Sequence, residues 1–275
     1  MTTREVAYRV TVGNVEMLSV SDGTGESPAA NAFPKATSAD WQRHPEALTA
    51  DGKLQFNFGS FVLRSQGQTI LVDTGLGPGG HGRLLEDLRA KGVSLDEITV
   101  VAITHLHGDH VGWNVVVEGG RHRLTFPKAK YWIPKGDWDH FRQPQQLERA
   151  PLLKTVVLPL EELGALRLVE GETAVTSEVS MVPTPGHTPG HMSLAVASQG
   201  QRGFITGDVI SAPVQAQEAA WEVAYDNDRE QGRRTREAVL ERLETDKSLV
   251  GAGHFLPPNF GRFVRTQGRR SWQGV

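Results

Sequence analysis

The segment Thr-His-Leu-His-Gly-Asp-His at residues 104–110 directly follows an apolar run and holds three histidines and an aspartate. An apolar run of this length predicts a buried strand. Alternate side chains of an extended chain point the same way, so His105 and His107 can bind one ion. The chain can turn at the intervening glycine, which lets Asp109 and His110 address a second ion close by. Because burying so many titratable groups without a cation is costly, the segment predicts a metal centre at a strand end.

Three later residues occupy similar settings, each after a short apolar run. They are His187 in Thr-Pro-Gly-His, Asp208 in Thr-Gly-Asp and His254 in Gly-Ala-Gly-His. A carboxylate can place one oxygen on each of two cations, so we expect Asp208 to bridge two divalent ions and the two histidines to complete their ligand sets. Imidazole and carboxylate ligands suit zinc first, and they also accept manganese, cobalt and iron. The predicted metal ligands are His105, His107, Asp109, His110, His187, Asp208 and His254.

A histidine or aspartate at a strand end is also common without any metal, and a lone histidine usually lies at the surface or is hydrogen-bonded in a core. We interpret the histidines outside the motifs in that way: His44, His81, His122 and His140. Asp73 and His191 are expected to orient metal ligands through their other polar atoms. The alternative for His191 is simple packing at a strand end.

The ordered set H-x-H-x-D-H, T-P-G-H-T-P-G-H, T-G-D and G-x-G-H resembles the metallo-β-lactamase-fold hydrolases. The sequence Leu-Val-Asp-Thr-Gly at residues 71–75 matches the first motif of that superfamily, and the resemblance covers residues 54–256. It implies an α/β fold, a four-layered αβ/βα sandwich with the metals at one edge between two sheets. We expect one such domain over residues 1–275. The doubled T-P-G-H and the compact ending are similar to the branch of quorum-quenching lactonases and methyl-parathion-hydrolase-like enzymes.

Composition is typical of a compact enzyme that acts on a small molecule. The chain has 275 residues with 38% hydrophobic content, which is enough for one large core. It contains no cysteine, which excludes disulfides and thiolate ligands. The net charge is −3 with no basic stripe, no apolar stretch reaches the length of a membrane helix, and the start lacks the regions of a signal peptide. We therefore expect a cytoplasmic protein that binds neither nucleic acid nor membrane.

Strand and helix patterns alternate along the chain as such a fold requires. Alternating apolar residues predict a hairpin over residues 8–20 that turns at Gly13, and further strands over 56–63 and 69–72. Apolar residues at helical spacing predict a helix over residues 235–245.

Two segments are candidates for contact with substrate. Residues 21–55 are rich in Gly, Pro, Ala and Ser, so we expect a lid, an arm exchanged across a homodimer, or disorder. Residues 135–155 predict a helical insertion over the metal face. The side chains expected to contact substrate are Trp113, Phe33, Phe141 and Ser211. Ser211 stands where acyl-homoserine lactonases commonly have a tyrosine, and the alternative for the aromatic residues of the insertion is that they only pack it onto the body.

The expected chemistry is hydrolysis. Two divalent ions that share a water lower its pKa enough to hold hydroxide near neutral pH, and this hydroxide attacks a carbonyl or phosphoryl centre. Asp109 is expected to pass a proton to the leaving group. The resemblance implies carboxylic esters or lactones as substrates, with activated phosphotriesters as a side activity. The alternative is a mononuclear iron dioxygenase or a non-catalytic member of the same fold.

Overall fold

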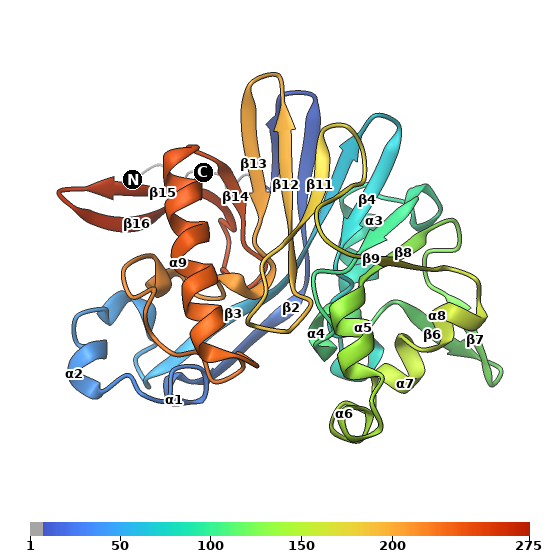
Figure 1. The fold of residues 1–275 in the computed structure, drawn as a ribbon, viewed down its shortest axis with the longest axis horizontal. Helices are drawn as coiled ribbons and strands as arrows, with labels where there is room; N and C mark the ends of the chain where they lie inside the picture. Colours follow the sequence, from blue (N-terminus) through green and yellow to red (C-terminus); the bar gives the residue numbers. More distant parts are fainter. Residues whose placement is uncertain (1–7) are drawn as a thin grey trace.

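Two seven-stranded mixed sheets form the centre of the molecule (Figure 1). The computed structural model describes residues 8–275. The first sheet contains, in spatial order, β1 (Arg9–Val12), β2 (Val15–Pro28), β3 (Lys53–Ser65), β4 (Gln68–Val72), β5 (Val100–Ala102), β8 (Lys130–Pro134) and β9 (Leu166–Val169). The second contains β10 (Thr173–Ala174), β11 (Val179–Pro183), β12 (Met192–Ser198), β13 (Gln201–Ile205), β14 (Leu249–Gly251), β15 (Phe260–Thr266) and β16 (Arg269–Gly274). A separate hairpin is formed by β6 (Val115–Glu118) and β7 (Arg121–Leu124).

Helices lie on the outer side of each sheet (Figure 1). The α-helices are α1 (Ala29–Ala32), α2 (Ser38–Trp41), α3 (Leu84–Ala90), α4 (Gly108–Val111), α5 (Lys135–Phe141), α6 (Pro144–Arg149), α7 (Leu153–Val156), α8 (Pro159–Glu162) and α9 (Arg229–Thr245). Strand β4 shows how side chains separate the layers. Its Leu71 packs in the core on the helical side, whereas Ile70 and Val72 pack in the core between the sheets, as the period-two alternation of a strand requires.

The second sheet is covered in the same manner by α9. Its Leu240 and Leu243 pack in a core with Phe204 of β13 and Val250 of β14. The helix begins at an N-cap, Asp228, whose side chain accepts a hydrogen bond from a backbone amide of the first turn. The order helix, sheet, sheet, helix confirms the predicted four-layered αβ/βα sandwich.

The predicted hairpin, strands and helix over residues 235–245 are all present, but the bounds of the predicted lid or arm over residues 21–55 were too wide at both ends. Strand β2 continues to Pro28 and pairs with β3 from Lys53 onward, so the connection covers residues 29–52 and holds α1, α2 and the 3₁₀ turn η1 (Pro45–Ala47). The register shifts between Ser21 and Thr24. Backbone pairing therefore continues past a bulge where the alternation of side chains ends. Residues 135–155 contain α5 and α6 and reach into α7.

Strands β5, β11, β13 and β14 lead into the four segments that carry the predicted metal ligands. Three of these strands belong to the second sheet and one to the first, so the ligands meet where the two sheets face each other. No helix of residues 8–275 is both long enough and apolar enough to cross a membrane.

Helix α4 carries two predicted ligands. Its position depends on close contact between its C-terminal end at Gly112 and the loop after β4, which contains Gly75 and Gly77. The amide of Gly112 donates to the carbonyl of Gly75 at 2.7 Å, and a Cβ on Gly112 would lie 2.1 Å from the carbonyl carbon of Leu76. A Cβ on Gly77 would lie 2.3 Å from the carbonyl oxygen of Gly112. The loop after β4 and the end of α4 can be this close only because neither side carries a side chain.

We expect Gly112→Ala to lower the free energy of unfolding by about 1–3 kcal/mol, because the added methyl group meets backbone that has no room to move. Urea denaturation monitored by circular dichroism measures this change. The matched control is Gly79→Ala, since a Cβ there meets nothing within 4 Å, and it should change stability by less than about 0.5 kcal/mol. Equal stability of the two variants would contradict the proposed backbone contact.

Candidate metal centre

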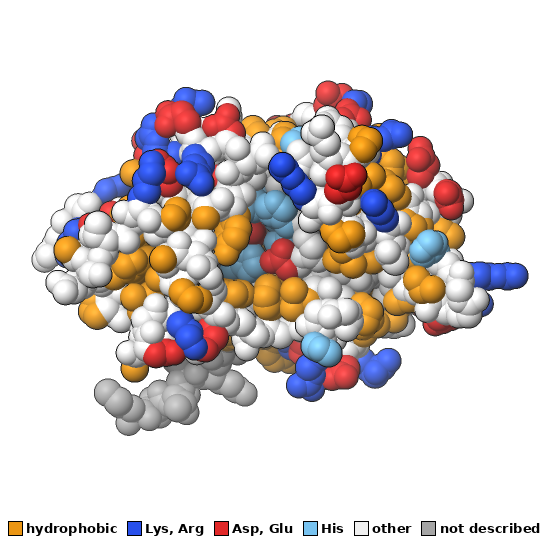
Figure 2. All heavy atoms as spheres, turned by 90° about the horizontal axis from the view of Figure 1, so that it is seen from below, with side chains coloured by type: hydrophobic (Ala, Val, Ile, Leu, Met, Phe, Trp, Pro, Cys, Tyr) orange, Lys and Arg blue, Asp and Glu red, His pale blue; other side chains and the backbone are white. Residues whose placement is uncertain are grey.

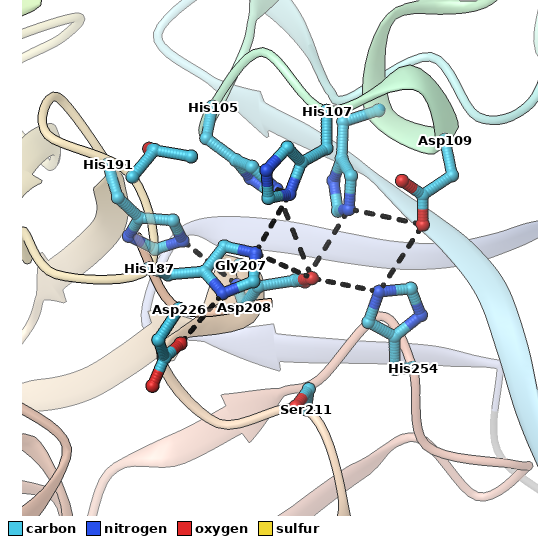
Figure 3. Close-up of polar contacts among 12 residues, drawn as sticks. His105, His107, Asp109, His187, His191, Gly207, Asp208, Ser211, Asp226 and His254 are labelled. Carbon is cyan, nitrogen blue, oxygen red and sulfur yellow. Dashed lines mark hydrogen bonds and ion pairs between the residues drawn. The ribbon is translucent and has the colours of Figure 1, made fainter. Parts of the chain in front are cut away.

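The structure brings all seven predicted ligands together at the edge between the two sheets (Figure 3). The side chains form three overlapping groups, and within each group the ligand atoms lie within 4.8 Å of one another. The groups are His105 with His107 and His187, His105 with His110 and Asp208, and Asp109 with His110 and His254. His105 and His110 each belong to two of these groups. The three groups therefore form two neighbouring half-sites with Asp208 between them.

Four of the five histidines are held in the same way: Nδ1 faces a protein acceptor, which directs Nε2 toward the centre of the cluster. Nδ1 of His105 lies 3.0 Å from the Thr104 hydroxyl. The other three distances are all 2.9 Å, and they join Nδ1 of His110 to the Asp73 carboxylate, that of His187 to the Asp226 carboxylate and that of His254 to the Asn57 carbonyl. The Thr104 hydroxyl donates its own proton to Asp73, so it accepts from His105. A neutral ring that donates at Nδ1 has a lone pair at Nε2. Each of these four rings is therefore arranged as a ligand.

The fifth histidine, His107, presents Nδ1 instead. This nitrogen lies 3.1 Å from Nε2 of His105 and 3.0 Å from Nε2 of His187. If His105 and His187 donate at Nδ1, only one proton, on His107, is left to be shared among these three nitrogens, whereas a cation placed among them would bind all three. In the other half-site, the buried Nε2 of His110 has no hydrogen-bond partner among the described residues.

The separations among the ligand atoms fit shared cations. Oδ2 of Asp208 lies 3.0 Å from Nε2 of His254 and 3.5 Å from Nε2 of His187, and its Oδ1 lies 3.5 Å from Nε2 of His110. Oδ2 of Asp109 lies 3.6 Å from Nε2 of both His110 and His254. Two ligands of one tetrahedral zinc ion, each about 2.0–2.1 Å from it, are about 3.3 Å apart. The residues present therefore fit a pair of divalent cations.

The pKa values of two of the histidines are lowered, and those of two others are raised. Burial lowers the pKa of His105 well below its ordinary value. Burial also lowers the pKa of His107 to about 3, and the neighbouring His187 adds to the effect. Both rings are thus neutral at physiological pH, which is the state in which imidazole binds a metal.

The half-site that contains Asp109 behaves in the opposite way. Burial disfavours the charged forms of His110 and His254, but Asp208 and Asp109 outweigh it, so the pKa of His110 lies well above its usual range and that of His254 is about 9. Burial likewise disfavours the charged form of Asp208, yet His254 and His110 hold the pKa of this carboxyl well below its ordinary value. The two carboxylates stabilise positive charge beside them, which divalent cations supply when bound.

Asp73 and His191, the two predicted orienting residues, both contact the ligand set. Asp73 accepts from His110 and from the amide and hydroxyl of Thr104, so it holds both ends of the motif. Nε2 of His191 accepts from the backbone amide of Asp208 at 2.9 Å. A Cβ on Gly207 would lie 2.6 Å from that nitrogen, which explains the glycine before the aspartate. His191 thus fixes the backbone of the central carboxylate.

Two buried aspartates near the ligands were missed by sequence reasoning. Asp226 accepts from His187. Asp137 accepts from the amides of Leu106 and Gly190 and from the hydroxyl of Thr188, and it thereby joins the loop after β5 to the loop after β11. Both lie outside the motifs that carry the predicted ligands, and the contacts that join them to the ligand loops span 31 or more residues. No local sequence pattern identifies them.

The candidate metal centre opens into a cavity of about 890 Å³, and Figure 2 shows the hollow with histidine and acidic side chains at its base and hydrophobic side chains around it. The cavity reaches His107, Asp109, Asp208 and His254. Its apolar walls include Phe33, Leu48, Leu54, Phe56, Phe58 and Leu256. Among the described residues, no lysine or arginine lines it. It is suited to an uncharged molecule with an apolar part.

The four side chains expected to contact substrate have different positions. Phe33 and Ser211 line the cavity. Trp113 does not: its indole N–H donates to Asp22 at 3.0 Å and its ring packs against the core on the helical side of the first sheet. Phe141 is not among the lining residues either, although its ring centroid lies 6.0 Å from that of His107. Closeness in sequence to the histidine motif predicted that Trp113 lies at the cavity, but its indole contacts Asp22 of β2 and the core instead.

Residues 60–254 match the family model described as the metallo-beta-lactamase superfamily. This match covers more than half of the chain, and the site geometry agrees with it. The protein belongs to the metallo-β-lactamase superfamily.

Comparison with individual proteins gives more distant similarities. The N-acyl homoserine lactonase AiiA of Bacillus thuringiensis subsp. kurstaki is 26% identical over 175 residues, which cover 56% of this chain and only 63% of the lactonase. The hydrolase AbOPH has a similar structure, with a TM-score of 0.84 at 22% identity over 100% of this chain and 99% of that one. AidC, a dizinc quorum-quenching lactonase, also has a TM-score of 0.84, at 21% identity over 97% and 96% of the two chains. At these identities, the two structures establish the fold only.

We expect Asp73→Asn to weaken zinc binding about 10–100-fold, because His110 loses the charged acceptor that fixes its ring. Asparagine tolerates the left-handed backbone of this position, where φ is 61°, so the fold should be kept. Competition with a chelating dye measures the affinity. Asp96→Asn, at an exposed position, is the control and should bind zinc like the wild type. Unchanged affinity in Asp73→Asn would show that this carboxylate does not orient the ligand.

Proposed function

We propose that this protein is a binuclear metal-dependent hydrolase of carboxylic esters or lactones. The observation that carries the proposal is the arrangement of the imidazoles. Four donate at Nδ1 to protein acceptors and direct Nε2 at two carboxylates, at the base of an apolar cavity. A structural metal site would be closed, whereas this one opens into a space large enough for a substrate.

Each residue has a proposed task. His105, His107 and His187 would hold one ion, Asp109, His110 and His254 would hold the other, and Asp208 would contact both. When bound, such ions lower the pKa of water toward neutrality and polarise a carbonyl oxygen. The dizinc relative AidC and the sequence similarity to N-acyl homoserine lactonases support zinc and this type of reaction.

Asp109 is the carboxylate proposed to move the proton. Its side chain is 26% exposed and lines the cavity, whereas that of Asp208 is 9% exposed and surrounded by histidines. A carboxylate at the cavity surface whose Oδ2 faces the other ligands can accept a proton at Oδ1 from the attacking water and give it to the departing alkoxide. Asp208 is the poorer candidate, because its oxygens face three of the histidines.

The cavity favours an uncharged substrate with an apolar arm. Away from the predicted metal ligands the lining is largely apolar and, among the described residues, holds no lysine or arginine, so a charged group on the arm of a substrate would lose its hydration without gaining a partner. Neutral esters and lactones meet this requirement, and so do neutral phosphotriesters as a side activity. We propose that residues 29–52 form the cap of this cavity. Phe33 and Trp41 of this segment pack on Trp221, with ring centroids 5.6 Å and 4.8 Å away.

We expect the purified protein to carry two ions per chain when it is loaded with zinc, manganese or cobalt, and to hydrolyse lactones or aryl esters with apolar acyl chains. Treatment with EDTA should abolish the activity and metal addition should restore it, as measured by absorbance assays and elemental analysis. A substrate of equal length that ends in a carboxylate is the matched control and should have a higher KM. One redox-active iron per chain would favour the dioxygenase, and no hydrolysis of lactones, aryl esters, phosphotriesters or β-lactams would refute the proposal.

We expect Asp109→Asn with both ions retained to lower kcat about 10²–10⁴-fold for esters with a poor leaving group, since proton transfer typically contributes that much. An activated aryl ester needs less help from an acid and should lose less. Comparing the two leaving groups in the same metal-loaded variant separates proton transfer from metal binding. An equal loss for both substrates would exclude the proposed proton transfer.

A further inference from the structure

A buried ion pair lies directly behind the candidate metal centre. Arg236 of α9 and Asp226 each have side chains that are only 1% exposed, and Nη2 of Arg236 donates to Oδ2 of Asp226 at 2.7 Å. Arginine is rarely buried in this way, because removal of its charge from water is unfavourable unless every polar atom finds a partner. The pair is therefore a costly feature of the fold that needs an explanation.

The second oxygen of Asp226 contacts a predicted ligand. Oδ1 accepts from Nδ1 of His187 at 2.9 Å, so the three side chains form one continuous series (Figure 3 shows its Asp226–His187 part). Arg236 holds one carboxylate oxygen and His187 binds the other. The orientation of the carboxylate, and hence that of the imidazole, depends on the arginine.

Arg236 also fixes the chain that leads from the central carboxylate to Asp226. Its Nε donates to the carbonyl of Val209 at 3.0 Å, and its Nη1 donates to those of Ala219 and Trp221 at 3.2 Å and 3.4 Å. One guanidinium thus binds three carbonyls and a carboxylate within residues 209–226. This planar group of five donors cannot be replaced by lysine, which has three donors on one atom.

The N-terminal part of α9 packs against the loop that carries His187. The amide of Asp228 donates to the carbonyl of Gly186 at 2.9 Å, and the hydroxyl of Thr235 donates to that of Pro185 at 2.7 Å. A Cβ on Gly232 would lie 2.6 Å from Oδ2 of Asp226. The helix therefore has no room for a side chain at the point where it passes the ion pair.

We propose that Arg236 is a positioning residue for one half of the metal centre: through Asp226 it holds His187 in the orientation that binds the ion shared with His105 and His107. The proposal rests on the metal centre of the proposed function. The other half is oriented from the first sheet, where Asp73 follows β4 and the Asn57 carbonyl belongs to β3. Loss of Arg236 should therefore affect one ion and spare the other.

The competing explanation is that Arg236 only balances the buried charge of Asp226. Arg236→Met alone leaves that charge unpaired and can unfold the protein. The double variant Asp226→Asn/Arg236→Met removes both charges and keeps an acceptor near His187. Gly232→Ala keeps both charges but displaces the carboxylate, while alanine favours the helix over glycine. Arg236→Lys tests partial rescue. The matched control is Arg233→Met, which removes a partly exposed arginine that pairs with Glu230 and Glu237 on the same helix.

The experiment titrates the full-length apo proteins with Zn²⁺ against a chelating dye, counts bound zinc by elemental analysis, and follows the Nδ1 proton of His187 by NMR of ¹⁵N-histidine-labelled apo protein. In the double variant and in Gly232→Ala, we expect one of the two sites to weaken about 10–100-fold, the other to stay unchanged, and the His187 proton to exchange faster with water. Arg236→Lys should lie between these variants and the wild type, and Arg233→Met should match the wild type.

A folded double variant that binds two zinc ions with wild-type affinity would overturn the proposal, and so would equal weakening of both sites. Thermal unfolding of the same samples shows whether each variant is folded, and Gly232→Ala is expected to fold but to be less stable than the wild type, because its methyl group meets the buried carboxylate of Asp226. The readouts are independent of catalysis. A wild-type protein that binds two zinc ions but hydrolyses nothing would refute the proposed function and leave the result on Arg236 standing.

Discussion

The structure depends on one constraint, which is that five imidazoles and two carboxylates, most of them buried, face one another at the base of a cavity. Without a fixed orientation, such groups would satisfy each other by rotating into ordinary hydrogen bonds. The protein prevents this for four of the rings by giving Nδ1 an acceptor outside the cluster. The Nε2 atoms then point inward, where their lone pairs favour cations. The orientation of the ligands is thus decided by residues that never reach the ions.

These outer acceptors come from both halves of the fold. Asp73 and Asn57 lie on segments of the first sheet, whereas Asp226 lies just before α9, which covers the second. Asp137 adds a direct link, because its carboxylate binds backbone amides of the loop after β5 and of the loop after β11. The metal centre therefore lies at the junction of the two halves, and any relative movement of the sheets would separate His105 from His187. A rigid junction keeps the ligand atoms close enough to share cations.

The sequence predicted the side chains that meet at this site and two residues that orient them, Asp73 and His191, but it missed the other supporting residues for a physical reason. The histidine motif, the strand before it and the later glycine-flanked ligands are local patterns, and the fold places them where the resemblance implies. Asp226, Asp137 and Arg236 act through contacts between distant segments, so their own neighbours in sequence carry no sign of the role. The error over residues 21–55 has a related cause, since β2 continues through backbone pairing that side-chain alternation does not record. Trp113 shows that closeness in sequence to a ligand does not decide whether a ring lines the cavity.

The same segment that builds part of the cavity also holds the metal centre. Residues 209–226 begin beside the central carboxylate, contribute Ser211 and Val214 to the cavity wall, and end at the aspartate that orients His187. Because Arg236 binds this segment at several carbonyls, a change in the wall there displaces a ligand as well. The opposite wall, from Phe33 to Phe58, also reaches the metal centre, because Phe33 packs on Trp221 and the Asn57 carbonyl orients His254. Substrate preference can therefore change most readily through apolar lining residues such as Leu48 and Leu54, whose side chains cannot hydrogen-bond to a ligand, whereas the wall formed by residues 209–226 must stay nearly constant.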